Sequence, residues 1–389
     1  MRVVIIGGGA MGSAVALFLK RQGGAGVDVT VVEPDPGLAR ASSALSAGSI
    51  RQQFSNAINV RMSQFGHEVI ANAQAWLGVD DEPVDLGFVP SGYLFLATGS
   101  TGVLEANHAV QRDLGVPVRL LARDELASRF PWLRVEDVQL ASLGEGGEGW
   151  FDGYAFARAL ARKARSIGAR WHRARVTGLE REGDRLRAAS LDDGTRLEAD
   201  AIVNAAGPWA RSVAALAGVA LPVHARRRTV FAFSCPTTLP LTPLVIDPSG
   251  CWFRSEGHQF IGAWTPGEHD DDPDDLPLDE PDIALFEERL WPALAHRVPA
   301  FEALRLTRAW AGYYEVHPLD HNAIIGPHPE LANLLFVNGF SGHGLQHAPA
   351  AGRGIAEWLL EGGWRSLDLS PFAYARLAEG HAFAELAVI

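Results

Sequence analysis

Hydrophobic positions near the start of the chain follow first the pattern of a buried strand and then that of a helix. Residues 3–6 form an apolar run that predicts a buried parallel strand. The apolar positions after it recur at helical spacing: Ala14, Val15, Phe18 and Leu19. Gly23 and Gly24 predict the end of this helix, and the segment 27–33 (VDVTVVE) predicts a second strand. The predicted order is therefore strand, helix, strand.

Similar patterns predict further elements downstream. Apolar positions at helical spacing predict a helix that starts near Asp152 and stops at Gly168. The segment 175–203 predicts a β-meander, whose last strand leads into Ala206–Gly207. In the last sixty or so residues, an apolar strand is followed by the loop 339–344 (GFSGHG) and then by a long helical pattern.

Three glycines stand where the first strand gives way to the first helix. Gly7 permits a tight turn, Gly9 lets a pyrophosphate approach the backbone, and Gly12 lets helix and strand pack closely. The N–H groups and the dipole at the start of the helix favour phosphates. Glu33 follows about 20 positions later, where a carboxylate can bind a ribose diol. A glycine-rich turn that served packing alone would leave Glu33 unexplained, so the unit predicts dinucleotide binding.

The predicted dinucleotide is FAD, because no contiguous series of strand–helix units follows Glu33. The chain continues instead through a segment of small and hydroxylic residues that can run alongside a long cofactor: Ser42, Ser43, Ala47, Gly48 and Ser49. The loop 339–344 then opens a second glycine-rich helix far along the chain. The positive end of that helix would stabilise the negative charge of a reduced flavin. The alternative is a surface loop with a glycine cap.

Composition favours an acidic, soluble protein. Against 46 Asp and Glu stand 34 Lys and Arg, and the net charge of −12 without a basic tract argues against nucleic-acid or anionic-lipid partners. No apolar stretch approaches the roughly 20 residues that a membrane span needs. With no leader and only two cysteines, Cys235 and Cys251, we expect a cytoplasmic protein. No metal site is expected, and the acidic run 269–282 is interpreted as a solvated loop.

Several motifs, in this order, resemble the D-amino acid oxidase superfamily, the FAD-dependent amine oxidoreductases that include glycine and sarcosine oxidases. The resemblance covers nearly the whole chain: ARASSALSAGSIRQQFS, PSGYLFLA, RFPWL, EGWFDGY, IVNAAGPWA, RVPAFEALRLTRAWAGYYE, GFSGHGLQHAP and DLSPF. It is greatest for a mitochondrial branch implicated in the assembly of respiratory complex I.

The resemblance implies a mixed α/β fold with two discontinuous domains. A Rossmann-like FAD-binding domain would comprise residues 1–80, 147–220 and 316–389, and a substrate domain built on an antiparallel β-sheet would comprise residues 81–146 and 221–315. The residues predicted to bind FAD are Gly7, Gly9, Ala10, Met11, Gly12, Glu33, Ser42, Ser43, Ala47, Gly48, Ser49, Val176, Ala206, Gly207, Gly342, Gly344, Leu345 and Gln346. Relatives with tethered FAD carry a histidine or cysteine where this chain has Leu45 or Ala311–Gly312, so we expect non-covalent FAD.

The chemistry that the resemblance implies is removal of a hydride from the carbon next to an amine, followed by hydrolysis of the imine. For an amino acid substrate, an arginine should hold the carboxylate. Arg51 is the first candidate, although it could instead tune the flavin; Arg254 is the second, although it could be an exposed strand residue. Tyr314 is predicted to cover the substrate if its neighbour on the strand faces the core. His343 is a candidate for proton handling.

Two differences from the relatives restrict the expected substrate and the expected electron acceptor. Gln346 stands where sarcosine-oxidising relatives offer a lysine, so simple sarcosine is disfavoured. Related oxidases use a lysine to activate oxygen, but the only two lysines, Lys20 and Lys163, fall on predicted helices of the flavin domain. We therefore expect a dehydrogenase with an unknown electron acceptor. A 2-hydroxy acid dehydrogenase and a flavin-stabilised respiratory assembly factor stay open as alternatives, and the oligomeric state stays open too.

Overall fold

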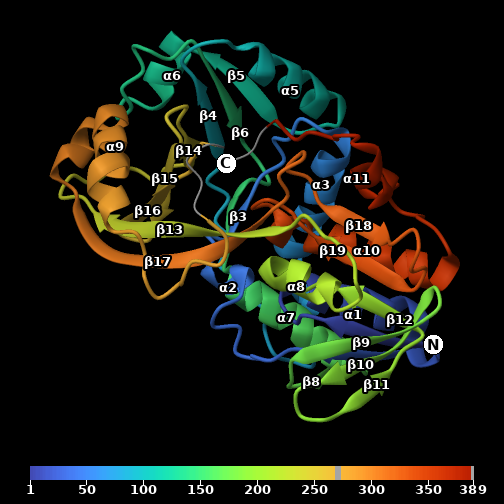
Figure 1. Cartoon of the computed structure of the whole chain (residues 1–389). Helices are drawn as coiled ribbons and strands as arrows, with labels where there is room; N and C mark the ends of the chain where they lie inside the picture. Colours follow the sequence, from blue (N-terminus) through green and yellow to red (C-terminus); the bar gives the residue numbers. More distant parts are fainter. Residues whose placement is uncertain (268–272, 387–389) are drawn as a thin grey trace.

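A six-stranded sheet forms one half of the molecule (Figure 1). The computed structural model describes residues 1–267 and 273–386. The strand order in this sheet is β18 (Ile324–Pro327), β19 (Leu334–Asn338), β12 (Ala201–Asn204), β1 (Arg2–Ile6), β2 (Asp28–Val32) and β8 (Arg170–His172). All neighbours are parallel except β18 and β19. The first strand thus lies at the centre, with β2 and β12 on its two sides, which is where a doubly wound sheet opens a crevice at its carboxyl edge.

Helices and a small sheet cover the two faces of this sheet. Apolar side chains of four helices pack into one core: α1 (Ala10–Gly23), α3 (Ala57–Ala71), α7 (Gly153–Ser166) and α10 (Gly344–Glu361). On the other face lie α8 (Ala210–Ala215) and a meander of β9 (Val176–Glu182), β10 (Arg185–Leu191) and β11 (Arg196–Glu198). Both faces of the central strands are therefore buried, which explains their continuous apolar runs.

An eight-stranded sheet forms the other half. Its order is β17 (Arg305–Val316), β13 (His224–Ser234), β16 (Gln259–Trp264), β15 (Cys251–Glu256), β14 (Leu244–Ile246), β4 (Tyr93–Ala97), β6 (Leu140–Gly144) and β5 (Val118–Ala122). Only β14 and β4 pair in parallel. Apolar residues of α6 (Arg123–Arg129), the π-helical turn Phe286–Leu290 and α9 (Trp291–Arg297) pack on one face, and α5 (Gly102–Asp113) lies along β5 and β6. The opposite face turns toward the six-stranded sheet, as Figure 1 shows for the long β13–β17 pair.

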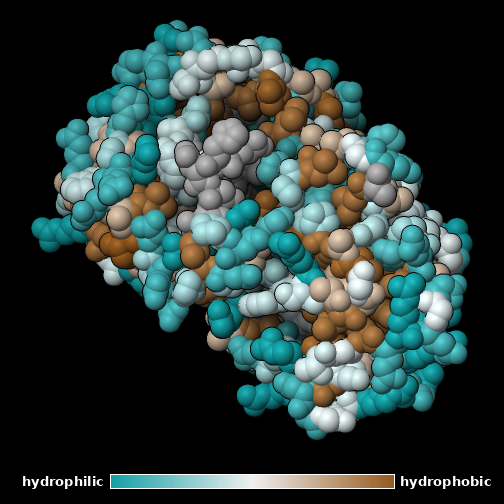
Figure 2. Space-filling model, in the orientation of Figure 1, coloured by the Kyte–Doolittle hydropathy of each residue, from teal (hydrophilic) through white to brown (hydrophobic). Residues whose placement is uncertain are grey.

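Short elements connect the two halves and complete the fold. They are α2 (Ser42–Leu45), α4 (Ala73–Leu77), α11 (Ala375–Glu379), the strand pair β3 (Ser49–Ile50) and β7 (Gly149–Trp150), and the 3-10 turns Gly24–Gly26, Gly207–Trp209, Pro299–Ala303 and Ser370–Phe372. Hydrophilic residues cover most of the face shown in Figure 2, and hydrophobic residues lie between them in separate groups. After β2, the chain does not return directly to the six-stranded sheet but continues through α2 and β3 toward the other half.

The mixed α/β class and the predicted strand–helix–strand unit are confirmed. The predicted helix near Asp152 begins at Gly153, and the Asp152 carboxylate accepts the N–H of Ala155 at 2.8 Å as its cap. The β-meander and the helix after the second glycine-rich loop are confirmed as well. The eight strands of the larger sheet come from residues 93–144 and 224–316. The division of the chain into two domains at the predicted boundaries stays a prediction.

Residues 269–272 of the acidic run 269–282 lie outside the described residues, and residues 273–282 are exposed or half-buried, as expected of a solvated loop. Asp274 also makes contacts with the larger sheet: its side chain is 28% exposed, with one carboxylate oxygen 2.7 Å from Nδ1 of His224 and the other 3.6 Å from the Arg226 guanidinium. The carbonyl of Leu276 accepts the hydroxyl of Tyr313 at 2.7 Å. Basic side chains on β13 attract the run, so this part of it packs against the larger sheet.

Candidate active site

A cavity of about 660 Å³ lies between the two large sheets, at the carboxyl end of β1. It is lined by the turns after β1, β2 and β12, by the start of α10, and by strands of the larger sheet. Of the residues predicted to bind FAD, all but Gly12 line it: Gly7, Gly9, Ala10, Met11, Glu33, Ser42, Ser43, Ala47, Gly48, Ser49, Val176, Ala206, Gly207, Gly342, Gly344, Leu345 and Gln346. Three segments that are far apart in the sequence therefore meet in one cavity.

Two glycines shape the turn between β1 and α1. Gly7 has a φ of +105°, and a Cβ on it would overlap the carbonyl oxygen of Ala205 in the turn after β12. Gly12 does not line the cavity, because it faces the turn: a Cβ on it would overlap the carbonyl oxygen of Gly7. The turn can therefore close only with glycine at both positions. Its closure brings the start of α1, where N–H groups favour phosphates, to the wall of the cavity.

The serines of α2 secure this wall. The hydroxyl oxygen of Ser43 accepts the backbone N–H of Ala10, the first residue of α1, at 3.1 Å. The hydroxyl of Ser42 donates to the carbonyl of Tyr313 on β17 at 2.7 Å. Both serines line the cavity, but both hydroxyls are engaged by the protein, so in this structure they join α2 to α1 and to the larger sheet.

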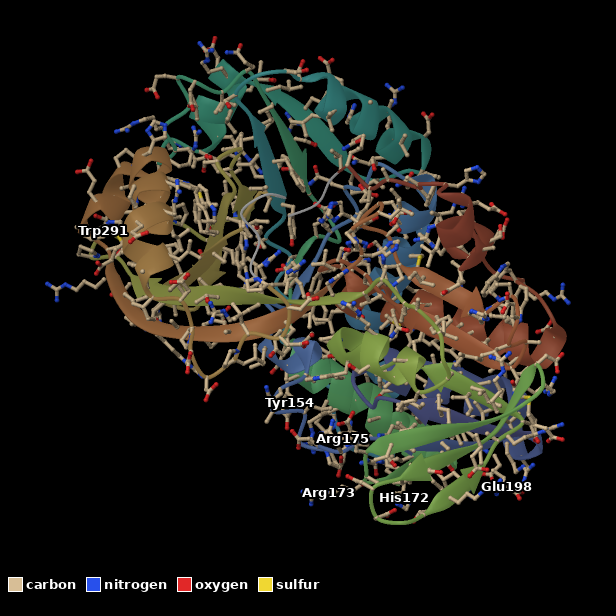
Figure 3. All side chains as sticks on the ribbon, viewed as in Figure 1. Tyr154, His172, Arg173, Arg175, Glu198 and Trp291 are labelled. Carbon is tan, nitrogen blue, oxygen red and sulfur yellow. The ribbon has the colours of Figure 1, made fainter. Side chains whose placement is uncertain are left out.

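Glu33 lies at the end of β2, as the dinucleotide motif predicts. One carboxylate oxygen accepts the N–H of Gly8 and the other accepts the N–H of Asp35, each at 2.8 Å. Burial raises the pKa of Glu33, and these two hydrogen bonds offset part of that rise. Arg175, beside Val176 at the start of β9, also lines the cavity near Glu33; Figure 3 shows it beside His172 and Arg173, in the half of the molecule opposite Trp291. A carboxylate and an arginine thus border the nucleotide end.

His343 and Gln346 lie at the start of α10, and both line the cavity. His343 is 5% exposed, and burial together with the charge of Arg51 lowers its pKa to about 3. Its imidazole is therefore neutral at physiological pH, and Nε2 is a buried polar atom without a hydrogen-bond partner among the described residues. Gln346 accepts the backbone N–H of Arg51 through Oε1 at 2.7 Å.

Arg51, the first catalytic candidate, lies in the cavity wall with 3% exposure. Its guanidinium stacks over the ring of Phe54 at 4.0 Å and lies 5.5 Å from the ring of Phe95. It also donates to the carbonyl of Gln53. Burial lowers the pKa of Arg51, and neighbouring anions work against that shift. The side chain is thus a positively charged group held rigidly at the cavity.

Arg254 and Tyr314, the other two candidates, have different positions. Arg254 is buried on β15 but does not line the cavity; it donates to the carbonyl of Ala47 at 2.7 Å and stacks on Trp150 at 4.6 Å. The prediction that it could be solvent-exposed is wrong. Tyr313 and Tyr314 of β17 both line the cavity; Tyr313 is 4% exposed and its hydroxyl is hydrogen-bonded. Arg254 therefore supports the wall that Ala47 forms, and the role of Tyr314 in covering a substrate stays a prediction.

Two charged residues of the larger sheet line the cavity and were not predicted. Arg228 lies on β13, with its guanidinium 5.5 Å from the ring of Tyr314. Glu315 lies on β17, accepts the N–H of Gly339 at 3.1 Å, and has a pKa that burial raises to about 7. Strand alternation was the available signal for Arg228, because residues 228 and 230 share a face once β13 is known to be a strand.

Apolar side chains from five strands complete the wall on the side of the larger sheet. Residues of neighbouring strands stand in register, since Val230 pairs with Ala263 and Ala263 with Trp252. The apolar residues of this sheet that line the cavity are Tyr93, Val230, Leu244, Trp252, Ala263 and Trp264. The cavity thus has a nucleotide side rich in glycine and a second side, on the larger sheet, that is apolar and carries Arg228.

A dinucleotide-binding crevice that is closed by a second sheet is typical of cofactor-dependent oxidoreductases. The model of the family "DAO: FAD dependent oxidoreductase" matches residues 2–358, and the chain belongs to this family. FAD-dependent oxidoreductase domain-containing protein 1 of Bos taurus is 42% identical over 425 residues, covering 100% of this chain and 87% of that protein. Glycine oxidase of Geobacillus kaustophilus is 27% identical and covers 96% of both chains. The crystal structure of L-proline dehydrogenase from P. horikoshii superposes with a TM-score of 0.86 at 27% identity, covering 98% of both.

The protein is therefore an FAD-dependent oxidoreductase, and its cavity fits the cofactor. The glycine turn after β1 and Glu33 are the features of a dinucleotide site, and the buried Nε2 of His343 is available to form a hydrogen bond with a ligand at the start of α10. The two free cysteines, Cys235 and Cys251, do not line the cavity. Non-covalent attachment stays a prediction. Within the described residues, no helix is long and apolar enough to cross a membrane, and no three His, Cys, Asp or Glu side chains gather as metal ligands would.

Proposed function

We propose that this chain is an FAD-dependent dehydrogenase that oxidises the C–N bond of a small amino acid or secondary amine carrying a carboxylate. The observation that carries the proposal is the convergence of Arg51, Arg228 and an apolar wall on the cavity whose other side is the cofactor cradle. Bound FAD supplies the hydride acceptor for such a reaction. The residues of this chain need only bind, orient and shield the substrate.

The positive charges of the two arginines favour an anionic ligand in the cavity. A guanidinium in a site shielded from water makes charge-assisted hydrogen bonds to a carboxylate, and it stays charged at all physiological pH values. Arg228 belongs to the strand that also supplies Val230, so a carboxylate on Arg228 would leave the rest of the substrate against the apolar wall. Arg51 supplies a second positive charge from the opposite half.

The state of His343 favours an amine over a hydroxy acid. Removal of a hydride from an alcohol carbon needs a base for the hydroxyl proton, whereas an amine that binds neutral needs none. Because the pKa of His343 is lowered to about 3 by burial and by the charge of Arg51, its imidazole is a weak base. Its neutral ring can still orient a polar group through Nε2.

The names of two relatives support an amino acid substrate, since they are a glycine oxidase and an L-proline dehydrogenase. The dehydrogenase preference is supported by the two lysines. The ammonium of Lys20 donates to the carbonyls of Gly24 and Val27, and that of Lys163 donates to the carbonyl of Gly78. Neither lysine lines the cavity. Slow reoxidation of the reduced enzyme by air in stopped flow is expected, and rapid reoxidation would establish an oxidase instead.

Anaerobic flavin bleaching tests the reaction class. The flavin-loaded protein is mixed with N-substituted glycines, D-amino acids, proline and 2-hydroxy acids, and the flavin absorbance is followed. We expect fast, saturable bleaching by one of the amines that carry a carboxylate. Bleaching by a 2-hydroxy acid alone would overturn the proposal, and so would a lack of bleaching by every amine.

A pair of variants tests the carboxylate site. Arg228→Met should raise the KM for that substrate by at least about tenfold, the factor that about 1.4 kcal/mol of lost binding gives. Arg308→Met removes an exposed arginine of β17 that does not line the cavity, and it should leave KM unchanged. Equal KM values in both variants would remove Arg228 from the substrate site. A cytoplasmic location stays a prediction.

A further inference from the structure

The segment 383–386 is far from Arg51 in the sequence, but it is hydrogen-bonded to the residues that follow Arg51. The N–H of Leu386 donates to the hydroxyl oxygen of Ser55 at 3.0 Å, and Nδ2 of Asn56 donates to the carbonyl of Ala384 at 2.8 Å. Ser55 and Asn56 follow Arg51 by only a few positions. The segment is therefore joined to the same short stretch of backbone that carries the buried arginine.

Glu385 is the residue of this segment that turns inward. It is 2% exposed, and Oε1 accepts both the N–H of Ser55 at 2.8 Å and the hydroxyl of Ser55 at 2.7 Å. Oε2 accepts from Nδ2 of Asn59 on α3 at 2.8 Å. These donors favour the ionised form of the carboxylate, whereas its burial favours the protonated form.

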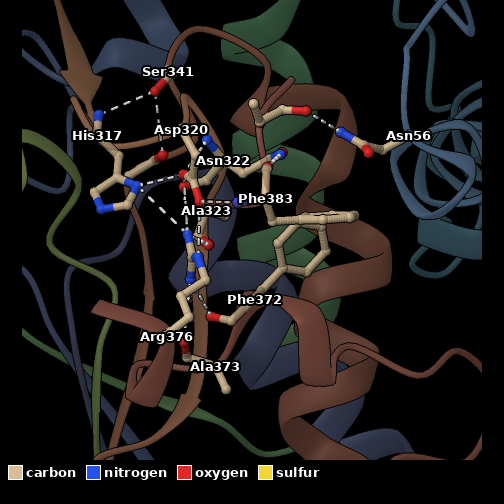
Figure 4. A network of polar contacts seen from close by, with 12 residues as sticks. Asn56, His317, Asp320, Asn322, Ala323, Ser341, Phe372, Ala373, Arg376 and Phe383 are labelled. Atoms are coloured by element: carbon tan, nitrogen blue, oxygen red, sulfur yellow. Dashed lines mark hydrogen bonds and ion pairs between the residues drawn. The ribbon is translucent and has the colours of Figure 1, made fainter. Parts of the chain in front are cut away.

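A network of hydrogen bonds around Asp320 also holds the segment 383–386 (Figure 4). The N–H of Phe383 donates to Oδ2 of Asp320 at 3.0 Å, and the N–H of Glu385 donates to its backbone carbonyl at 3.0 Å. Asp320 is fully buried and is itself bonded to Arg376 at 2.9 Å and to His317 at 2.8 Å. The position of Glu385 is thus fixed by bonds to two separate parts of the fold.

The side chains of Glu385 and Arg51 are bonded to the same short stretch of backbone. Arg51 donates to the carbonyl of Gln53, and Glu385 accepts the N–H of Ser55 two positions further on. Burial raises the pKa of Glu385, but the charge of Arg51 and the hydrogen bonds from Ser55 and Asn59 outweigh it, so the pKa is lowered. The other buried carboxylate near Arg51 is Glu148, whose pKa burial raises to about 7, so a share of it is protonated at neutral pH. Of these two glutamates, Glu385 is therefore the one that compensates Arg51 at all physiological pH values.

We propose that Glu385 is a positioning residue for the flavin site, which compensates the charge of Arg51 and thereby sets the electrostatic field in the cavity. The segment lies beyond the residues 2–358 that the family model matches, and the proposal holds for any substrate. Removal of the carboxylate leaves only the partly protonated Glu148, of these two glutamates, to compensate the charge of Arg51. A reduced flavin carries more negative charge than an oxidised one, so the stronger positive field stabilises the reduced form.

A double-variant cycle on the flavin midpoint potential tests this, with the flavin-loaded full chain and a reference dye. Glu385→Gln should shift the potential to a more positive value. In the Arg51→Met background the same substitution should give about half of that shift or less, because without Arg51 the buried carboxylate becomes protonated. An equal shift in both backgrounds would overturn the proposal, and so would no shift in the wild-type background.

Three further variants separate charge from folding. Glu379→Gln removes an exposed carboxylate of α11 and should leave the potential unchanged. Glu385→Asp keeps the charge, so a potential shifted as far as in Glu385→Gln would mean that packing acts and would overturn the proposal. If Glu385→Gln yields no flavin-loaded protein, Ser55→Ala removes one donor to the same carboxylate, the hydroxyl, and should give a smaller shift in the same direction; an unchanged potential would contradict the proposal. No substrate is involved, so a negative substrate screen leaves this test intact.

Discussion

The backbone N–H of Arg51 donates a 2.7 Å hydrogen bond to the side-chain oxygen of Gln346, 295 positions away in the sequence. Both residues are buried and both line the cavity. The bond therefore joins the segment after β2 to the start of α10, the two parts of the chain that enclose the cavity from the nucleotide side. It is the direct contact between the two predicted flavin-binding segments.

Gln346→Leu should weaken both stability and flavin retention. The substitution leaves a buried N–H without its acceptor, which costs about 1–3 kcal/mol of unfolding free energy. We expect a lower denaturant midpoint and a lower flavin-to-protein ratio after dialysis. Glu361→Gln, at the exposed end of the same helix, is the control and should match the wild type. A Gln346→Leu protein that keeps its flavin as well as the control would show that the bond does not hold the cavity together.

Two glycines near the start of the chain should respond oppositely to an added methyl group. A Cβ at Gly12 would overlap the carbonyl oxygen of Gly7, so Gly12→Ala should cost about 3 kcal/mol or more and abolish flavin binding. A Cβ at Gly26 would have no atom within 4 Å, so Gly26→Ala should be neutral. Thermal unfolding and the flavin absorbance of the purified proteins measure both effects. Full flavin content in Gly12→Ala would contradict the close packing of helix and strand.

Glu315 should make the protein less stable as the pH rises toward neutrality. Burial raises its pKa to about 7, whereas in the unfolded chain the pKa is about 4.3. Between these values the folded state keeps a proton that the unfolded state loses, so stability falls as the pH increases. Glu315→Gln removes this share of the pH dependence. The thermal midpoint of the variant, relative to that of the wild type, should therefore rise from pH 4 to pH 7. The exposed Glu105→Gln should show no such trend.

Local sequence patterns predicted the residues on the cofactor side of the cavity because each of its parts is a continuous stretch of sequence. The glycine turn, Glu33 and the start of α10 each belong to one strand–loop–helix unit. Arg228 and Glu315 were missed because their position depends on the pairing of β13 with β17, which links residues about 90 positions apart. Arg254 was predicted as a site residue or an exposed one, but the sheet turns it inward to Ala47. Long-range pairing was the missing information in each case.

The buried pair of Asp320 and Arg376 should make the protein sensitive to acid. Burial raises the pKa of Asp320, but hydrogen bonds from His317 and Arg376 outweigh it and hold that pKa well below its usual range. The stability it contributes is therefore present above about pH 4, the unfolded value, and is lost as the pH falls toward the folded one. The stability difference between the wild type and Asp320→Asn should be largest at neutral pH and should narrow in acid. Asp113→Asn, at an exposed site, should differ from the wild type at no pH.

Flavin should leave the protein when the fold is destroyed, because no residue suited to a covalent bond stands at the two places where relatives are tethered. Leu45 occupies one of them and lies against Gly312, which occupies the other: a Cβ on Gly312 would lie 3.0 Å from that of Leu45. Neither residue has a nucleophilic side chain that could form a covalent bond to a flavin. Precipitation with trichloroacetic acid should therefore release the yellow chromophore into the supernatant. Flavin that stays in the pellet would point to a tether elsewhere in the cavity, where His343 is the one imidazole among the lining residues that the structure describes, and His343→Ala would then free it.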